Sequence, residues 1–378
     1  MDDRLRAKEV GILLSGGLDS SSVATVAHEL REAKYPALEL HAFTSTYQNL
    51  LPDHDAPPAR AVAAALRIPQ HCWAADSVGL FERWDDPRVY WPEPIDDPFA
   101  VGFRDEFKAI AGTVRVLLSG EGSDNLMEFE MAQHLRALWR EGRIGRVSLD
   151  LAEHVWQRFL APDGLRGPLR RIRRWFSPRQ SDPSFPDWIQ PELAARLNLM
   201  ARWKDSVANL PWHTHPRRPK WYGSLFLPQW DLMFRFGDAG MTRQPLEICY
   251  PFLDLRLVNY LLAIPTMPWF FRKHLLRQAM RGRLPERIRM RPKTPLQGEP
   301  LLAALQRGDA NAIAKMQPAD RLSHYIKENW SPSFTGEMNA EEVWLKMRPM
   351  CLNFWLLSLA RTPSLDGVAQ RSSAADTK

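Results

Sequence analysis

The sequence predicts an α/β protein, in which helices cover both faces of a parallel sheet, followed by a mainly helical C-terminal region. Short apolar runs alternate with helix-forming segments over residues 1–119. These runs lack the polar alternation of a half-exposed strand, as expected for parallel strands that are buried on both faces. Over residues 225–354, apolar residues instead recur with the spacing of helices.

The individual elements follow from local signals. The apolar run at residues 10–15 ends in Gly16 and Gly17, and helix formers begin at Ser20, so we expect a strand, a glycine loop and a helix in this order. A second helix begins with prolines, which are favoured in a first helical turn. We predict strands at residues 10–15, 38–46, 71–74 and 114–119, and helices at residues 20–33, 56–66 and 103–112.

The bulk properties indicate a globular protein. The chain has 378 residues, 45% of them hydrophobic, and a formal net charge of +6. Such a charge is compatible with a polyanionic ligand, but it is also common in proteins that bind none. Three separated cysteines without metal-ligand spacing predict neither a disulfide framework nor a zinc site, and indicate a reducing, cytoplasmic location. No apolar run reaches the roughly 20 residues that cross a membrane.

A glycine loop with the sequence SGGLDSS occupies residues 15–21, directly after the first predicted strand. Two glycines let the backbone approach a phosphate, and serine hydroxyls and free N–H groups at a helix start can donate to it. Asp19 in such an anion site implies a divalent cation between the two charges, which predicts Mg²⁺. A tight turn with a helix cap is the alternative, but the complete pattern favours a phosphate site.

A second loop, SGEGSD at residues 119–124, follows the last predicted strand of the sheet. Ligands of parallel sheets bind beyond the carboxyl ends of the strands, so both loops should face one crevice. Glu121 could take a proton from an attacking amine, and Asp124 offers a second metal ligand. The alternative is a structural turn between strand and helix.

Two further motifs are less informative by their chemistry. Residues 246–254 read as an apolar turn that ends in an aspartate cap, and a single lysine such as Lys273 usually faces solvent on a helix. In this order, however, SGGLDSS, SGEGSD, residues 246–254 and the segment KHLLR at residues 273–277 resemble the synthetase domain of asparagine synthetase, a PP-loop (HUP-like) ATP pyrophosphatase. Its relatives include beta-lactam synthetases and lasso-peptide cyclases. The resemblance covers residues 10–292.

The resemblance implies a set of site residues. Asp19 and Asp124 would hold Mg²⁺, Glu121 would be the general base, and Lys273 would stabilise charge on the phosphates. Contacts to ATP and pyrophosphate would come from Leu14, Ser15, Gly16, Gly17, Asp19, Ser20, Ser45, Ser119 and Gly120.

Substrate contacts are less well defined. Asp97 lies in an acidic-Pro-Phe segment similar to one near the substrate in the family, although an acidic turn explains it equally well, and Asp254 ends the third motif. Asn125, Cys249 and His54 stand where the family usually has an acidic residue, an arginine and an acidic residue. These departures predict altered metal or substrate contacts.

The implied activity is ATP-dependent amide formation. Attack of a carboxylate on the α-phosphate would give an acyl-adenylate and pyrophosphate, and ammonia or an amine would then displace AMP. The carboxylate could be aspartate, as in asparagine biosynthesis, or a peptide or small molecule in a natural-product pathway, as in macrocyclases and tailoring amide synthetases.

The source of the amine stays open. Glutamine-dependent members of the family begin with a glutaminase domain whose nucleophile is an N-terminal cysteine. Only nine residues precede the first predicted strand here, so we expect that domain to be absent. Free ammonia, a separate glutaminase subunit, an amine within the substrate, such as a precursor peptide, and a truncated gene product are the alternatives.

Composition predicts four parts in the chain. Residues 1–148 would be the PP-loop nucleotide-binding core, 149–224 a basic Arg/Pro/Trp-rich connecting region, 225–362 a helical region that completes the site, and 363–378 a disordered tail. A solvated connector explains the arginines at residues 166–179 better than a contact to nucleic acid or a peptide leader.

Two competing classes are a non-catalytic nucleotide-binding subunit and a tRNA-modifying PP-loop enzyme. Intact loops together with Glu121, Asp124 and Lys273 argue against the first, because a decayed site should have lost one of them. The second usually has cysteine pairs or an RNA-binding module, and neither is present. Nucleic acid is therefore not an expected partner.

Overall fold

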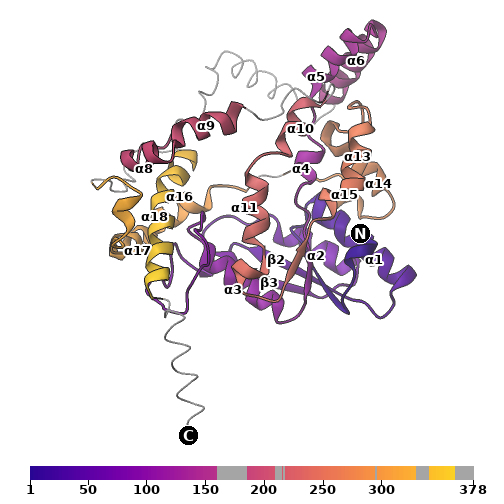
Figure 1. Ribbon diagram of the computed structural model, residues 1–378. Coiled ribbons are helices and arrows are strands. Elements are labelled where there is room, and N and C mark those ends of the chain that lie inside the picture. Colours follow the sequence, from indigo (N-terminus) through magenta and orange to yellow (C-terminus); the bar gives the residue numbers. More distant parts are fainter. Residues whose placement is uncertain (160–184, 209–214, 216–217, 294–295, 329–339, 362–378) are drawn as a thin grey trace.

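A five-stranded parallel sheet forms the centre of the computed structural model, which describes residues 1–159, 185–208, 215, 218–293, 296–328 and 340–361. The strand order is β3-β2-β1-β4-β5 (Figure 1). The strands are β1 (Glu9–Leu13), β2 (Glu39–Thr46), β3 (Gln70–Ala74), β4 (Val116–Leu118) and β5 (Glu247–Cys249). The predicted α/β class is confirmed. The order in which successive strands are added to the sheet reverses between β1 and β4, and folds of this kind bind ligands at such a point.

Four of the five strands lie where the sequence predicts them. The fifth, β5, was not predicted, because three residues are too few to show a strand pattern. It pairs with β4 in the register Val116 to Glu247, and its Glu247 N–H donates to the Arg115 carbonyl at 2.9 Å. The loops after β1, β4 and β5 consequently meet at one edge of the sheet.

Helices cover the sheet and then form the C-terminal region. The first three are α1 (Leu18–Lys34), α2 (Ala56–Ala65) and α3 (Ala100–Ala111), close to their predicted positions. The others are α4 (Ser123–Leu126), α5 (Met131–Arg140), α6 (Ile144–Phe159), α8 (Pro191–Arg196), α9 (Leu199–Ala208), α10 (Pro219–Ser224), α11 (Gln229–Phe236), α12 (Ala239–Thr242), α13 (Leu255–Ala263), α14 (His274–Ala279), α15 (Glu286–Arg289), α16 (Pro300–Ala304), α17 (Ala310–Lys315) and α18 (Ala340–Arg361). Short 3-10 turns include Asp2–Arg4, Ala75–Ser77, Pro251–Leu253, Phe271–Lys273 and Leu322–His324, and a π turn spans Leu305–Asp309.

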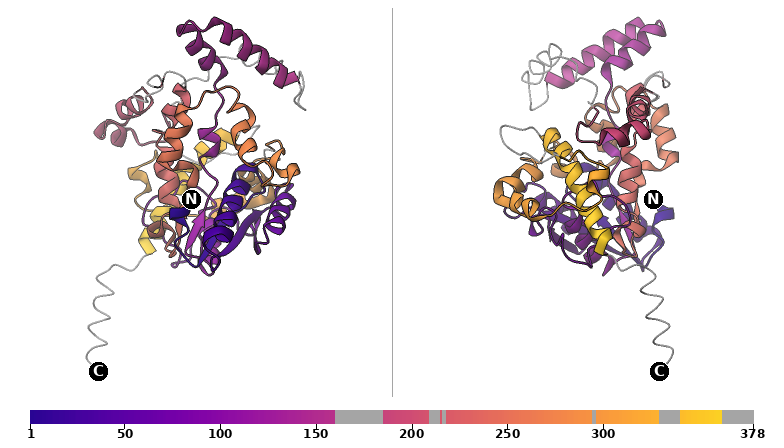
Figure 2. Two further views of the ribbon diagram at one scale, coloured as in Figure 1. Left: turned by 90° about the vertical axis from the view of Figure 1, so that its right-hand side faces the viewer. Right: turned by 60° about the vertical axis from the view of Figure 1, so that its left-hand side comes forward.

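Two large apolar clusters fix the helical region to the N-terminal part of the chain, and the first of them includes the sheet. In one, side chains of α13, α14 and α15, such as Leu276, pack with those of α1, α2 and the inner strands. In the other, α18 packs through Met347 and Phe354 on the segment 78–101. Figure 2 shows α18 and α13 on different sides of the molecule. The predicted helical C-terminal region is confirmed.

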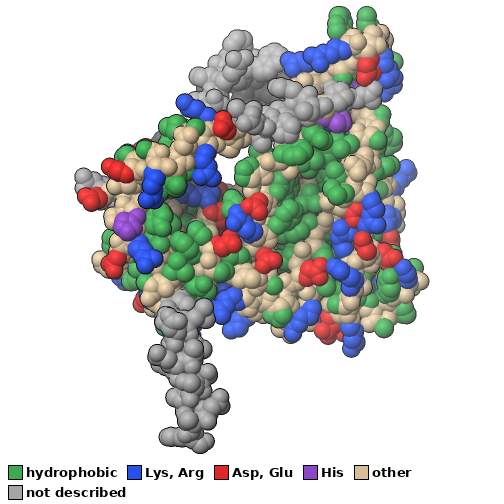
Figure 3. Space-filling model, viewed as in Figure 1, with side chains coloured by type: hydrophobic (Ala, Val, Ile, Leu, Met, Phe, Trp, Pro, Cys, Tyr) green, Lys and Arg blue, Asp and Glu red, His purple; other side chains and the backbone are tan. Residues whose placement is uncertain are grey.

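The helices α5 and α6 form a hairpin that projects from the body (Figures 1 and 2). A buried contact joins them, because the His134 Nε2 lies 2.6 Å from an Asp150 oxygen. On the face shown in Figure 3, hydrophobic side chains gather around α11, where Phe226 and Phe234 are exposed.

Two predictions concern other parts of the chain. The arginines at residues 166–179 and the tail at 363–378 lie outside the described residues. Within the described ranges, no helix combines the length and the apolar character that membrane crossing requires.

Candidate active site

The first glycine loop connects β1 to α1 through a backbone that requires glycine. Gly16 has a φ of +70°, and a Cβ atom there would lie 2.3 Å from the Ala59 backbone nitrogen in α2. Both the left-handed conformation and the close approach exclude a side chain. The loop is therefore pressed against the start of α2.

The serines of this loop lie over the start of α1. The hydroxyl oxygens of Ser15 and Ser20 are 3.0 Å apart, and the Gly17 N–H donates to the Ser15 hydroxyl at 3.4 Å. The helix begins after Gly17, which has no side chain to accept its first N–H groups. Free N–H groups and hydroxyls at the positive end of a helix dipole form a suitable site for an anion.

The second loop packs directly on the first. A Cβ atom on Gly120 would lie 2.9 Å from the Ser20 backbone nitrogen. Gly122 has a φ of +89°, and a Cβ atom there would lie 2.5 Å from Leu253. Within the loop, the Glu121 N–H donates to the Ser119 hydroxyl at 3.2 Å. These contacts set the carboxylates of the second loop beside the first loop.

Lys273 joins the two loops. Its Nζ lies 2.5 Å from an Asp19 oxygen and 2.6 Å from an Asp124 oxygen, and its side chain is only 17% exposed. The Ser123 hydroxyl also donates to Asp19, at 2.7 Å. The structure therefore brings together Asp19, Asp124 and Lys273, which the sequence separates into three motifs.

The backbone before α14 directs Lys273 into the site. Arg272 and Lys273 both have left-handed conformations, with φ of 50° and 55°. Such conformations are uncommon outside glycine and often occur at functional sites. Arg277 supports this turn, since its side chain donates to the Arg272 carbonyl at 2.8 Å.

The carboxylates of the second loop differ in their electrostatics. Partial burial raises the pKa of Glu121 above its ordinary value, and the negative charges of Asp124 and Asp19 raise it further. Partial burial also acts to raise the pKa of Asp124, but hydrogen bonds from Lys273 and Lys293 outweigh it and hold the pKa below its usual range. Glu121 is therefore the better proton acceptor of the two.

The predicted nucleotide-side residues lie at the ends of β1, β2 and β4. The Leu14 carbonyl accepts a hydrogen bond from the Thr44 hydroxyl at 2.8 Å, and the Ser119 N–H donates to the Cys249 carbonyl at 2.9 Å. Ser45 donates to the buried Glu106, whose pKa is raised by burial. Sequence reasoning missed Glu106, since one acidic residue in a predicted helix carries no signal.

Asp97 precedes α3 in the chain. Its carboxylate accepts a hydrogen bond from the Phe99 N–H at 2.8 Å, yet burial raises its pKa to about 6. Burial and then the charge of Asp97 raise the pKa of Tyr47, which directly follows β2. Asp97 is thus close enough to Tyr47, at the end of β2, for its charge to act on that residue.

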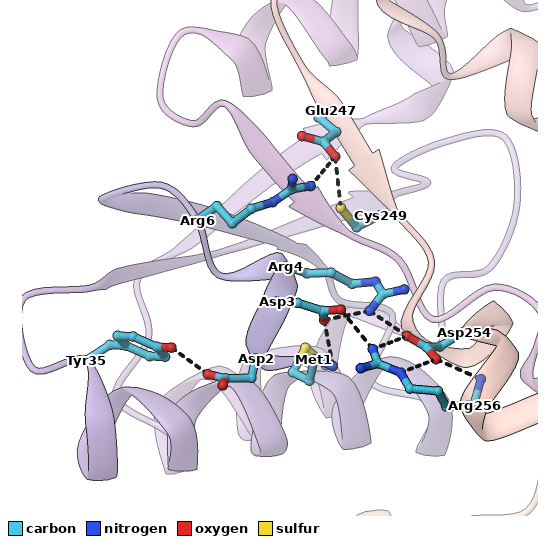
Figure 4. A network of polar contacts seen from close by, with 10 residues as sticks. All are labelled: Met1, Asp2, Asp3, Arg4, Arg6, Tyr35, Glu247, Cys249, Asp254 and Arg256. Atoms are coloured by element: carbon cyan, nitrogen blue, oxygen red, sulfur yellow. Dashed lines mark hydrogen bonds and ion pairs between the residues drawn. The ribbon is translucent and has the colours of Figure 1, made fainter. Parts of the chain in front are cut away.

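Asp254 belongs to a different network, drawn in Figure 4. It accepts a hydrogen bond from the Arg256 N–H at 2.9 Å, which caps α13, and its oxygens lie 2.8 Å from Arg4 and 2.7 Å from the Arg256 guanidinium. These hydrogen bonds hold its pKa below the usual range. None of its contacts within the described residues is with Asp19 or Lys273. The sequence alternative, an aspartate helix cap, is confirmed.

Three further residues adjoin the site and were missed. Lys293 lies 2.6 Å from Asp124, and Arg291 donates to the Gly16 carbonyl at 3.4 Å. Tyr250 follows β5, and burial followed by the charge of Glu121 raises its pKa to about 12. The basic sequence after Leu284 and Pro285 was a signal for Arg291 and Lys293. Whether these side chains point toward the site, however, depends on the fold.

The parallel sheet and its two glycine loops define an α/β protein of the PP-loop type. The chain belongs to the asparagine synthase family, whose model matches residues 1–333. This match confirms the resemblance to the synthetase domain of asparagine synthetase.

The curated relatives carry two kinds of name. "Amidase chry2" of Gibberella zeae is 24% identical over 334 residues, covering 74% of this chain and 48% of the relative. "Amidase chyE" of Penicillium rubens is 25% identical, with shares of 75% and 48%. "Asparagine synthetase [glutamine-hydrolyzing] 2" of Bacillus subtilis (strain 168) is 25% identical over 299 residues, with shares of 76% and 36%. The chain spans half or less of the length of these relatives.

Proposed function

We propose that the chain is an ATP-dependent amide ligase that activates a carboxylate as an acyl-adenylate and transfers the acyl group to ammonia or an amine. The observation that carries this proposal is the meeting of Asp19, Asp124 and Lys273 between the two glycine loops. Family membership supports an amide ligase, and the loop geometry supports ATP as the source of energy.

The nucleotide would lie across the carboxyl ends of β1, β2 and β4. The start of α1, with Ser15, Gly16, Gly17 and Ser20, suits the β- and γ-phosphates, because its N–H groups are free to donate to an anion. Leu14, Ser45, Ser119 and Gly120 would contact the adenosine, since they end or follow the same strands.

Asp19 and Asp124 would hold Mg²⁺. Their oxygens lie within 2.6 Å of a single ammonium group, so a cation already stands between them. Carboxylate oxygens are the ligands that Mg²⁺ prefers, and the residues present therefore fit the ion. When bound, Mg²⁺ would offset the negative charge of the phosphates.

In the first step, a carboxylate oxygen of the substrate attacks the α-phosphorus, and the bond from this phosphorus to the pyrophosphate oxygen breaks. Negative charge grows on the phosphate oxygens as pyrophosphate leaves. Lys273 is placed to offset this charge, because its ammonium already lies among the carboxylates of the two loops. Fixed cations at such a position are the main catalytic resource in phosphoryl and nucleotidyl transfer.

In the second step, the amine nitrogen attacks the acyl carbon, and AMP leaves with the electron pair of the acyl–oxygen bond. The nitrogen must lose a proton, and Glu121 is placed to accept it, since its raised pKa makes it more basic than an ordinary glutamate. Asp97 is a proposed contact for the amine, because its partly buried carboxylate acts on Tyr47, which directly follows β2.

The first substrates that we propose to test are aspartate as the carboxylate and ammonium as the amine source, which together give asparagine. A panel of peptide and small-molecule carboxylates tests the macrocyclase and tailoring alternatives in parallel. Mass spectrometry of the products separates these outcomes.

The decisive test of the reaction type uses a carboxylate labelled with heavy oxygen. Acyl-adenylate formation transfers one labelled oxygen to AMP, whereas activation by the γ-phosphate would place it in inorganic phosphate. Carboxylate-dependent ATP–pyrophosphate exchange should accompany the first outcome. Failure to bind ATP with Mg²⁺ in calorimetry would instead support a non-catalytic subunit.

A further inference from the structure

Side chains of the kinds that bind metal ions gather where the strands of the sheet begin, on the edge opposite the two glycine loops. Glu9 begins β1 and lies opposite Glu39, the first residue of β2, in the register of these strands. His41 follows Glu39 by two residues, so both side chains lie on the same face of β2. One carboxylate oxygen of each glutamate and one ring nitrogen of His41 all lie within 4.8 Å of one another. Three groups from two adjacent strands therefore converge.

His71, on β3, fixes the orientation of His41. Its Nε2 lies 3.2 Å from the Nδ1 of His41, within hydrogen-bond distance. The His71 ring in turn stacks on Phe43 with 5.0 Å between the ring centres, and Phe43 belongs to a buried apolar cluster. The imidazole of His41 is therefore held through one nitrogen, which leaves its other nitrogen for a ligand.

That other nitrogen, the Nε2 of His41, is buried and has no hydrogen-bond partner among the described residues. A buried polar atom without a partner is unfavourable, and native structures usually satisfy such atoms. When His41 donates from Nδ1 to His71, its Nε2 carries the lone pair that can bind a metal ion. Histidines that bind metals are commonly oriented by a hydrogen bond from their other nitrogen in this way.

The two carboxylates supply the charge that a cation needs. The side chain of Glu39 is 54% exposed and lies 3.4 Å from Lys8, whose side chain is 76% exposed. Because exposed ion pairs of this kind are weak, Lys8 competes little with a divalent ion. One imidazole nitrogen and two carboxylate oxygens suit Zn²⁺ and similar transition metals better than Mg²⁺ or Ca²⁺, which prefer oxygen ligands alone.

We propose that Glu9, Glu39 and the Nε2 of His41 bind one divalent transition-metal ion such as Zn²⁺, and that His71 is a positioning residue for His41. The ion links the beginnings of β1 and β2 and stabilises the sheet, far along these strands from the glycine loops. The inference is therefore independent of the proposed function. Sequence reasoning missed this site, because its ligands come from separate strands and lack a recognisable spacing.

The first test measures the binding of Zn²⁺ by calorimetry and of Co²⁺ by its visible absorption. It compares the wild type with Glu9→Gln, His41→Gln and the control His324→Gln, which removes an exposed histidine. We expect both site variants to bind at least about tenfold more weakly than the wild type, and the control to match it. Wild-type affinity in His41→Gln, an equal loss in the control, or Mg²⁺ binding as tight as that of Zn²⁺ would overturn the inference.

A second comparison tests the role of His71. His71→Phe should weaken Zn²⁺ binding by about 10–100-fold, because His41 loses its hydrogen-bond partner. His71→Gln should keep more of the affinity, since its carbonyl oxygen can still accept from Nδ1. Equal affinities in the two variants would show that His71 does not act by positioning His41.

A third comparison separates this site from the nucleotide site. Asp124→Asn removes a proposed Mg²⁺ ligand and should keep the Co²⁺ absorption, whose loss would assign the ion to the nucleotide site instead. In EDTA, His41→Gln should melt at nearly the same temperature as the wild type, which shows that it folds. Excess Zn²⁺ should raise the melting temperature of the wild type but not that of His41→Gln. The same rise in both proteins would also overturn the inference.

Discussion

Lys273 and Asp19 are 254 positions apart in the chain, and their charged atoms lie 2.5 Å apart. Asp19 lies in the first turn of α1 beside the first glycine loop, and Lys273 precedes α14 in the helical region. A contact of this kind ties the first glycine loop to the C-terminal helices. It is also the most direct target for mutation.

Replacement of Lys273 with alanine should abolish carboxylate-dependent pyrophosphate release, with a loss of about 100-fold or more, because the transition state loses a fixed cation. Lys273→Arg should restore little, since the larger planar guanidinium spreads its charge and cannot place it at the point that the compact ammonium occupies. A coupled pyrophosphate assay measures the rate, and circular dichroism should show an unchanged fold. Undiminished turnover would remove Lys273 from the mechanism.

Glu121→Gln should separate the two steps of the reaction. The glutamine cannot accept a proton, so amide formation should fall while ATP–pyrophosphate exchange continues. In the wild type, the rate of amide formation should rise with pH through the pKa of Glu121, which lies above its ordinary value, because only the ionised form accepts a proton. Amide formation by Glu121→Gln at the wild-type rate would contradict this role. So would a variant in which only the ATP–pyrophosphate exchange reaction loses its dependence on pH.

Asp97 should make the folded protein less stable as pH rises. Its pKa is about 6 in the folded protein against an ordinary value of 3.8, so the folded state binds the proton more tightly than the unfolded chain. The stability from this proton is present below the ordinary pKa and is lost as pH rises through about 6. The free energy of unfolding in urea should be higher for Asp97→Asn than for the wild type at neutral pH. This advantage should be smaller by about 1–3 kcal/mol at acidic pH. An exposed control, Asp320→Asn, should follow the wild type.

The two glycines of the first loop should differ in their response to alanine. Gly16→Ala places a Cβ atom 2.3 Å from the Ala59 nitrogen and forces a left-handed conformation, so it should lower the melting temperature and weaken ATP binding. The nearest contact of a Cβ on Gly17 is the Ser15 hydroxyl at 3.4 Å. Gly17→Ala should therefore keep wild-type stability. Equal melting temperatures in the two variants would show that the loop can move away from α2.

Arg218 should be important for stability although it lies outside the site. It is fully buried, its guanidinium lies 4.0 Å from the centre of the Phe270 ring, and it donates to the carbonyls of Leu126 and Leu261. Arg218→Met leaves these carbonyls unpaired and should cost about 3 kcal/mol or more in urea unfolding.

Because Leu126 ends the short helix that carries Asp124, we also expect weaker nucleotide binding by Arg218→Met. The exposed Arg235→Met is the control, and a similar small change in both variants would contradict the prediction.

Local patterns explain why much of the sheet was predictable. The apolar run before Gly16 and the one before Gly120 are long enough to show that strands are buried on both faces. By contrast, β5 has only three residues and acquires its strand conformation by pairing with β4. The segment around Asp254 could be predicted as a helix cap, because capping depends on neighbouring residues alone.

By itself, the sequence determined the α/β class, the two glycine loops and the order of the motifs, because these depend on periodicity and on residues close together in the chain. Only the tertiary structure decided that Lys273 meets Asp19 and Asp124, that Lys293 shares Asp124, and that Asp254 pairs with Arg4. Such pairings depend on how α13 to α15 pack against α1, and the energy of that packing is spread over many side chains rather than encoded near any one of the paired residues.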